Sequence, residues 1–388
     1  MPTPSSRLLD RIRQLIATPS VSSVSPQFDR SNRPVVDLLA DWLEQAGFAA
    51  RIEPLPDRPD KANLIATLGE GTGGLVLAGH TDTVPFDAGR WRFDPFGGTI
   101  ADGRIYGLGS ADMKSFLALA IEAAREFAAG DLRRPLVILA TADEESSMAG
   151  ARALAAAGRP LGRHAVIGEP TGLKPVRMHK GILMEAIRLE GKSGHSSNPA
   201  LGASALEGMH RVMGELLQWR SELQARYRNP LFEVEVPTLN LGRIHGGDNP
   251  NRICGACELH FDLRPLPGMS LDELRATIRE RLARIADATG LGIAMRSLFP
   301  GLQPFAEDAG AAIVRAAEEF TGYSAGSVAF GTESPLLQRL GMQTVVLGPG
   351  SIRQAHQPDE YMERRQVEPM VGLLQRMIER FCVDGEPA

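Results

Sequence analysis

The sequence predicts an α/β fold: a three-layer domain whose mostly parallel sheet is covered by helices on both faces, interrupted by a smaller inserted α+β domain. Three observations lead to this prediction. The chain has 388 residues, more than one hydrophobic core usually supports. Short, wholly apolar runs alternate with helical patterns in its first part. The middle of the chain instead shows strands that alternate between apolar and polar residues.

The apolar runs of the first part are typical of parallel strands. A strand that is apolar throughout is buried on both faces, as in a sheet covered by helices. Between the first two runs, residues 113–129 carry apolar side chains at helical spacing, which predicts a connecting helix. The predicted strands are 75–78, 136–140, 165–167 and 344–347.

The middle of the chain has the order β-α-β-β-α-β, which predicts a ferredoxin-like α+β sandwich. Ser270 and Glu273 form a capping-box pattern at the start of its second helix. We therefore expect a discontinuous first domain of residues 1–180 and 296–388, with residues 181–295 inserted. The expected elements are 182–191, 199–227, 238–244, 253–263, 270–288 and 292–298.

Composition excludes several classes of protein. The net charge of −5 gives no sign of the basic surface that nucleic-acid binding requires. No run approaches about 20 apolar residues, so no membrane span is expected. Residues 1–15 lack the apolar core of a signal peptide, and three scattered cysteines indicate no disulfide framework. We expect a cytoplasmic protein that binds neither nucleic acid nor membrane.

Acidic and imidazole side chains follow the predicted strands at their carboxyl ends, where ligands collect in such sheets. His80 follows the first run, Glu144 and Glu145 follow the second, and Glu169 follows the third. Asp82 lies two residues beyond His80, so in an extended segment its carboxylate can take the imidazole N–H. Each pattern alone is more often structural, and only their combination indicates a site.

Two further segments add to this set. Asp112 stands at the start of the predicted helix, where Asp also serves as an N-cap. His356 lies in a loop rich in Gly and Pro. Two imidazoles with several carboxylates suit a mixed nitrogen and oxygen site for two zinc or cobalt ions. Two cations about 3.5–4 Å apart lower the pKa of a shared water and polarise a carbonyl, while a nearby carboxylate moves the proton.

Five motifs, in this order along the chain, resemble the aminoacylase, acetylornithine deacetylase and succinyl-diaminopimelate desuccinylase family of dinuclear-zinc metallopeptidases. They are GHTDTVP, GSADMK, DEE, GEPT and AHQPDEY. The resemblance covers about residues 9–381. It implies a zinc aminopeptidase-like catalytic domain, an inserted lid or dimerisation domain, a homodimer and a small N-acylated amino acid as substrate.

The resemblance also implies which residues bind metal. By their positions in the motifs, His80 and Glu169 bind one cation, and Glu145 and His356 bind the other. Asp112 bridges the two. The cations implied are two zinc ions, with cobalt as the alternative.

Further roles are implied for residues that bind no metal. Glu144 is the implied general base, and Asp82 orients a metal-bound imidazole. In the inserted domain, GKSGHSS resembles the segment whose His, here His195, reaches across the dimer to stabilise the oxyanion. Asn251 and Arg264 match positions that contact the polar groups and the carboxylate of the substrate. Arginine suits a bidentate carboxylate contact.

Four segments resemble the branch of the family that hydrolyses acetylornithine: GEPT, GGDN, FGTES and GPGSI. Desuccinylases lack the acid of FGTES, so Glu333 could face the substrate's side-chain ammonium. We expect the acetyl group to be removed from N2-acetyl-L-ornithine, a step of arginine biosynthesis. Phe330 and Gly331 replace the Tyr-Cys of some relatives, which leaves acetylcitrulline, succinyl-diaminopimelate and peptides open as substrates. A non-catalytic protein of this fold would lack Glu144 or a ligand, and none is missing.

Overall fold

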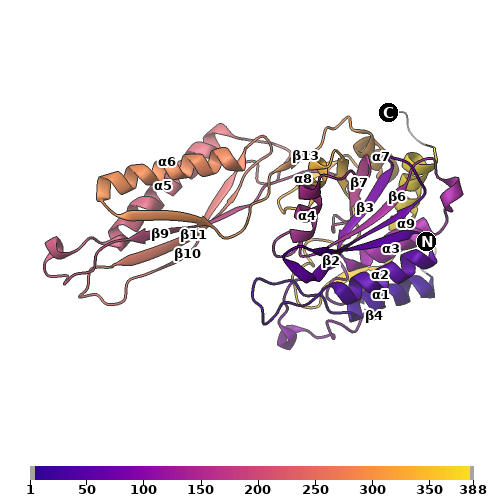
Figure 1. Cartoon of the computed structure of the whole chain (residues 1–388), viewed down its shortest axis with the longest axis horizontal. Coiled ribbons are helices and arrows are strands. Elements are labelled where there is room, and N and C mark those ends of the chain that lie inside the picture. The colour runs from indigo at the N-terminus through magenta and orange to yellow at the C-terminus, as the bar shows by residue number, and fades with distance from the viewer. Residues whose placement is uncertain (1–4, 385–388) are drawn as a thin grey trace. The chain divides into compact units, whose positions relative to one another are not determined.

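The computed structural model describes residues 5–384, which form two compact units (Figure 1). The second unit comprises Met178–Ala306 and Ser327–Gly331, and the first comprises the rest of the described chain. Helices and strands alternate in both units. The predicted α/β class is confirmed.

The main sheet of the first unit has a parallel centre and antiparallel flanks. The strands β6 (Leu136–Thr141), β3 (Leu75–His80), β7 (His164–Ile167) and β15 (Gln343–Val346) run parallel in that order. All residues of β3, β6 and β7 are buried, as their uniformly apolar sequences predict. The flanking strands are β1 (Ala49–Leu55), β2 (Arg58–Leu68), β8 (Val176–His179), β13 (Phe305–Ala306) and β14 (Gly326–Val328).

Helices cover both faces of this sheet (Figure 1). The helix α3 is predicted over 113–129 but ends at Ala124, and a 3-10 turn follows at Ala129–Asp131. No helix within residues 5–384 is both long and apolar enough to cross a membrane. One face carries α1 (Ser6–Ala17), α2 (Arg33–Gln45), α3 (Lys114–Ala124), α7 (Ala312–Thr321) and α9 (Val367–Ile378), and the other carries α4 (Ala149–Ala157) and α8 (Ser334–Arg339).

A small second sheet of the first unit consists of β16 (Tyr361–Glu363), β5 (Arg104–Tyr106) and β4 (Thr99–Ala101). It is antiparallel, and it links the segment after His356 to the segment before Asp112. Other short helical turns lie at Ala88–Arg90, Pro199–Leu201, Arg364–Gln366 and Glu379–Val383.

The second unit is a four-stranded antiparallel sheet with two helices on one face (Figure 1). The strand order β10-β11-β9-β12 gives the ferredoxin-like arrangement that the β-α-β-β-α-β order predicts. Ser270 caps the second helix by accepting the N–H of Glu273. The elements are β9 (Leu183–Glu190), α5 (Ala205–Arg226), β10 (Thr238–Gly246), β11 (Ala256–Arg264), α6 (Leu271–Thr289) and β12 (Gly292–Ser297).

Candidate metal centre

The side chains predicted to bind metal come together at the carboxyl edge of the parallel strands. His80 is the last residue of β3, Glu145 lies in the turn after β6, and Glu169 lies directly beyond β7. Asp112 precedes α3, whose N-cap is Met113, so the carboxylate of Asp112 does not cap the helix. His356 lies between β15 and β16, in a left-handed backbone conformation with φ 59°.

The Asp112 carboxylate lies between the two imidazoles. Its Oδ1 is 3.2 Å from Nε2 of His80, and its Oδ2 is 3.4 Å from Nε2 of His356. The same nitrogen of His356 is 3.1 Å from Oε1 of Glu145. Nε2 of His80 is 3.9 Å from Oε1 of Glu169. One oxygen of Asp112 is therefore directed to each of two His–Glu pairs.

These spacings fit two bound cations. Two ligand atoms, each about 2.1 Å from a zinc ion at a tetrahedral angle, lie roughly 3.4 Å apart. The nitrogen–oxygen distances of 3.1 to 3.9 Å lie on either side of that value. Ligand atoms of His80, Asp112 and Glu145 lie within 4.8 Å of one another, and so do those of His80, Glu144 and Glu169. The residues present therefore fit a dinuclear centre with nitrogen and oxygen ligands.

Hydrogen bonding leaves Nε2 of His80 available as a metal ligand. Its Nδ1 is 3.0 Å from the main-chain carbonyl oxygen of Asp82, an atom that only accepts, so Nδ1 carries the ring hydrogen. The Asp82 carboxylate is 3.7 Å from Nδ1. We expected that carboxylate to take the imidazole N–H, and the structure corrects this detail. The carboxylate is turned toward the loop after β6, where it accepts the main-chain N–H groups of Glu144 at 3.2 Å and Glu145 at 3.0 Å.

Burial raises the pKa of several acids at this centre. It raises the pKa of Glu144 and Glu169 well above their usual range, and neighbouring carboxylates add to the effect. Burial also raises the pKa of Asp82 to about 6. Repulsion among buried carboxylates favours either protonation or a bound cation. The site is therefore suited to hold positive charge.

The two histidines respond to the same acids in the opposite sense. Hydrogen bonds to Asp112 and Glu145 raise the pKa of His356 to about 10. Burial lowers the pKa of His80, but the hydrogen bond with Asp112 and nearby carboxylates outweigh it, and the net shift is upward. A metal must therefore displace protons from these imidazoles when it binds.

Glu360 belongs to this site, although no role for it was predicted. Its buried carboxylate accepts the main-chain N–H groups of Gly109 at 3.2 Å, Ala111 at 2.8 Å and Asp112 at 3.0 Å. It thereby joins the loop of Asp112 to the loop of His356. Burial raises the pKa of Glu360 to about 8. The signal in the sequence is its place in the AHQPDEY motif.

Glu333 is buried close to this centre. Its Oε2 accepts the hydroxyl of Thr141 at 2.8 Å, and its Oε1 has no hydrogen-bond partner among the described residues. Burial raises the pKa of Glu333 to about 7. Its charge also contributes to the raised pKa of Glu144 and Glu169. Glu333 therefore offers an unpaired carboxylate oxygen near the predicted ligands.

The remaining predicted residues belong to the second unit. His195 is exposed, and its Nδ1 is 3.2 Å from the main-chain nitrogen of Ser197, which only donates. Nδ1 therefore accepts, and Nε2 is left as the N–H donor of the ring. Asn251 is exposed. Arg264 is half-buried, with its Nε 2.8 Å from the carboxylate of Asp262.

A parallel sheet with imidazoles and carboxylates at its carboxyl edge is the arrangement of a metal-dependent hydrolase. The sequence profile of peptidase family M20/M25/M40 matches residues 76–380. The chain is 50% identical over 370 residues to acetylornithine deacetylase of Edwardsiella ictaluri (strain 93-146), covering 95% of this chain and 96% of that protein. The chain belongs to peptidase family M20/M25/M40, and it is a hydrolase that acts on amide bonds.

Solved structures share this fold over nearly the whole chain. An M20 family metallo-carboxypeptidase from Sulfolobus solfataricus superposes with a TM-score of 0.76 at 17% identity, covering 97% of this chain and 99% of that one. A dinuclear metal-binding peptidase of the M20 family from Bacillus subtilis gives a TM-score of 0.68 at 17% identity, covering 96% and 97%. These similarities confirm the predicted α/β fold.

Proposed function

We propose that the chain removes the acetyl group from N2-acetyl-L-ornithine to give L-ornithine and acetate in arginine biosynthesis. We further propose that two zinc ions serve the reaction, with cobalt as a substitute. The observation that carries the proposal is the Asp112 carboxylate, with one oxygen toward each His–Glu pair. The 50% identity to an acetylornithine deacetylase supports the substrate. The Bacillus subtilis peptidase, described as dinuclear, supports the number of metals.

When bound, the two cations polarise the amide carbonyl and lower the pKa of the attacking water. Glu144 takes the proton from that water and returns it to the amine nitrogen as the C–N bond breaks. The burial that raises its pKa suits a group that must hold a proton between these steps. Asp82 keeps Glu144 in place by accepting the N–H groups of its turn.

We assign the substrate contacts to side chains of both units. The unpaired Oε1 of Glu333 pairs with the side-chain ammonium of ornithine. Arg264 binds the α-carboxylate, and Asn251 binds a polar group of the substrate. The Nε2–H of His195 of a second protomer stabilises the oxyanion, since its tautomer makes that nitrogen a donor.

We also propose that the protein is a cytoplasmic homodimer, with the second unit as the lid and dimerisation domain. Its strand β10 is an edge strand, and such edges pair readily with another chain. All three cysteines are free thiols, as expected in a reducing compartment. Sedimentation analysis at micromolar concentration tests the dimer, and a single monomeric species would overturn it.

A carboxypeptidase or dipeptidase is the second candidate function, because the Sulfolobus solfataricus relative is a carboxypeptidase. Amine release by the zinc-loaded protein separates the candidates. Its substrates are N2-acetylornithine, N-acetylcitrulline, N-succinyl-diaminopimelate and a dipeptide. We expect the highest kcat/KM with acetylornithine. A preference for the dipeptide would overturn the substrate assignment.

Exchange of Glu333 for Gln tests the specificity contact. Loss of the buried charge opposite an ammonium group should reduce the preference for acetylornithine over a neutral acetylamino acid by about tenfold or more. The control is Glu319→Gln, an exposed acid that pairs with Arg380. An unchanged preference in Glu333→Gln would exclude the contact.

A further inference from the structure

Lys61 is a buried cation close to the metal centre. It lies on β2 and has no exposed surface, with 0% accessibility. Its Nζ is 2.5 Å from Oδ1 of Asp143 and 2.8 Å from Oδ1 of Asp29. A buried ammonium group is costly unless it is paired and hydrogen-bonded, so these two contacts decide its placement. Neither carboxylate belongs to the predicted metal ligands.

Asp143 begins the turn that presents Glu144 and Glu145 to the centre. Its φ of 56° is left-handed, a conformation that a residue with a side chain adopts at a cost. On one side of the turn, Asp82 accepts the N–H groups of Glu144 and Glu145. On the other side, Lys61 holds the side chain of Asp143. The turn is therefore fixed between a carboxylate and an ammonium group.

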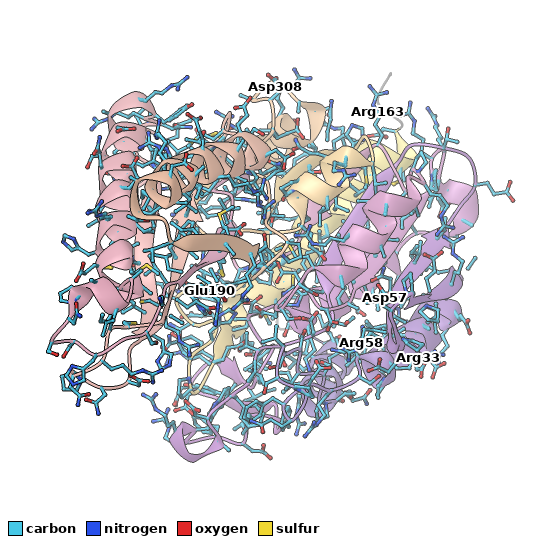
Figure 2. All side chains as sticks on the ribbon, turned by 60° about the vertical axis from the view of Figure 1, so that its left-hand side comes forward. Arg33, Asp57, Arg58, Arg163, Glu190 and Asp308 are labelled. Carbon is cyan, nitrogen blue, oxygen red and sulfur yellow. The ribbon has the colours of Figure 1, made fainter. Side chains whose placement is uncertain are left out.

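Further contacts support Lys61 and its turn. The hydroxyl of Ser22 donates to Oδ1 of Asp143 at 2.7 Å and lies 2.6 Å from the hydroxyl of Ser146. Asp29, the second partner of Lys61, also contacts Nη2 of Arg58 at 2.6 Å. Arg58 is exposed (Figure 2). A continuous set of polar contacts thus runs from the surface through the buried ammonium to the turn.

We propose that Lys61 is a positioning residue of this hydrolase. By anchoring Asp143 to β2, it sets the places of Glu144 and Glu145, and so acts on both proton transfer and metal binding. The part that concerns Glu144 rests on the proposed function. The part that concerns Glu145 rests on geometry, and it means that the cation next to Glu145 depends on Lys61 more than the cation next to His80.

The test compares Lys61→Met, which removes the charge, with Lys61→Arg, which keeps it. The control is Arg11→Met, since Arg11 is another buried cation of the first unit, 3.6 Å from Glu122. Metal-free proteins are titrated with Co²⁺ and followed by visible absorption. In Lys61→Met, we expect one of the two cobalt ions to bind about 10- to 100-fold more weakly. With acetylornithine, kcat should fall and KM change little, and Lys61→Arg should recover most of both losses.

Arg11→Met should lower the melting temperature without changing either cobalt affinity. Wild-type binding of both cobalt ions and wild-type kcat in Lys61→Met would overturn the proposal. Equal losses in Lys61→Met and Arg11→Met would also overturn it, because they would show general destabilisation. The cobalt titration uses no substrate, so a wild-type protein that fails to hydrolyse acetylornithine would contradict the proposed function and leave the Lys61 result standing.

Lys61→Met leaves the Asp143 carboxylate buried without its cation, which can prevent folding. The double variant Lys61→Met/Asp143→Asn removes both charges and keeps a residue type that tolerates the left-handed conformation. We expect this variant to fold and still bind one cobalt ion more weakly, because its turn is no longer anchored to β2. Wild-type affinity for both ions in the double variant would show that Lys61 only balances charge.

Discussion

Nδ1 of His80 donates a hydrogen bond to the main-chain carbonyl oxygen of Asp82 over 3.0 Å. The main chain of Asp82 thus fixes the imidazole, while its side chain accepts the N–H groups of Glu144 and Glu145. One residue serves metal binding through one group and the proposed proton transfer through another. These two services can be separated by mutation.

Asp82→Asn should affect the turn more than the imidazole. The variant keeps the main-chain acceptor for His80, but its side-chain NH₂ cannot accept a main-chain N–H. We expect zinc affinity at the His80 position to change by less than about threefold, and kcat to fall by roughly 10- to 100-fold. Chelator competition and steady-state kinetics measure the two quantities. A larger loss of metal affinity than of kcat would show that the carboxylate orients the ring.

Glu144→Gln should abolish turnover and retain both metals. The amide keeps the shape of the side chain but cannot carry the proton, so kcat should fall by about 10²- to 10⁴-fold. Metal analysis should still find two zinc ions, and KM should stay close to the wild-type value. Because Glu144 lies near His80 and Glu169, loss of one zinc ion in this variant would instead make it a ligand. Wild-type kcat would place the general base elsewhere.

Metal binding should release protons. The pKa of His356 is raised to about 10 by its hydrogen bonds to Asp112 and Glu145, so its imidazole is protonated in the metal-free protein at pH 8. A ligand imidazole must be neutral, and zinc affinity should therefore rise with pH up to about pH 10. Calorimetry in buffers of different ionisation enthalpy measures the protons released. We expect His356→Ala to release about one proton fewer than wild type, and equal release would contradict the assignment.

Mixing two inactive variants should restore activity if His195 acts across a dimer. In a mixed dimer of Glu144→Ala and His195→Ala, one site combines an intact Glu144 with an intact His195 from the other protomer. Random exchange of protomers should make about a quarter of all sites active. The assay mixes the variants after partial denaturation and refolding, with each variant alone as its control. No gain over the separate variants would place His195 in its own protomer's site or outside the reaction.

The sequence predicts the sheet and the neighbourhood of the ligands because both depend on local patterns. Wholly apolar runs mark β3, β6 and β7, and His80 and Glu169 lie at or just beyond two of them. Helix boundaries are less visible. Residues 199–227 were expected as one helix, but α5 begins only at Ala205, after a 3-10 turn at Pro199–Leu201 and its Ser204 cap.

The supporting contacts could not be predicted, because they join residues far apart in the chain. Glu360 accepts the N–H of Ala111 across 249 positions, and Lys61 reaches Asp143 across 82. A buried lysine in a strand and a glutamate in a motif show in the sequence only as residue types. Which main-chain or carboxylate group they meet depends on the packing of the whole domain.

The most direct test of the dinuclear centre is anomalous diffraction at the zinc edge from crystals grown with zinc. We expect two peaks about 3.5–4 Å apart, one next to His80 and Glu169 and the other next to Glu145 and His356, with the Asp112 carboxylate between them. A single peak, or two peaks that do not share Asp112, would contradict the bridging role on which the proposed function depends.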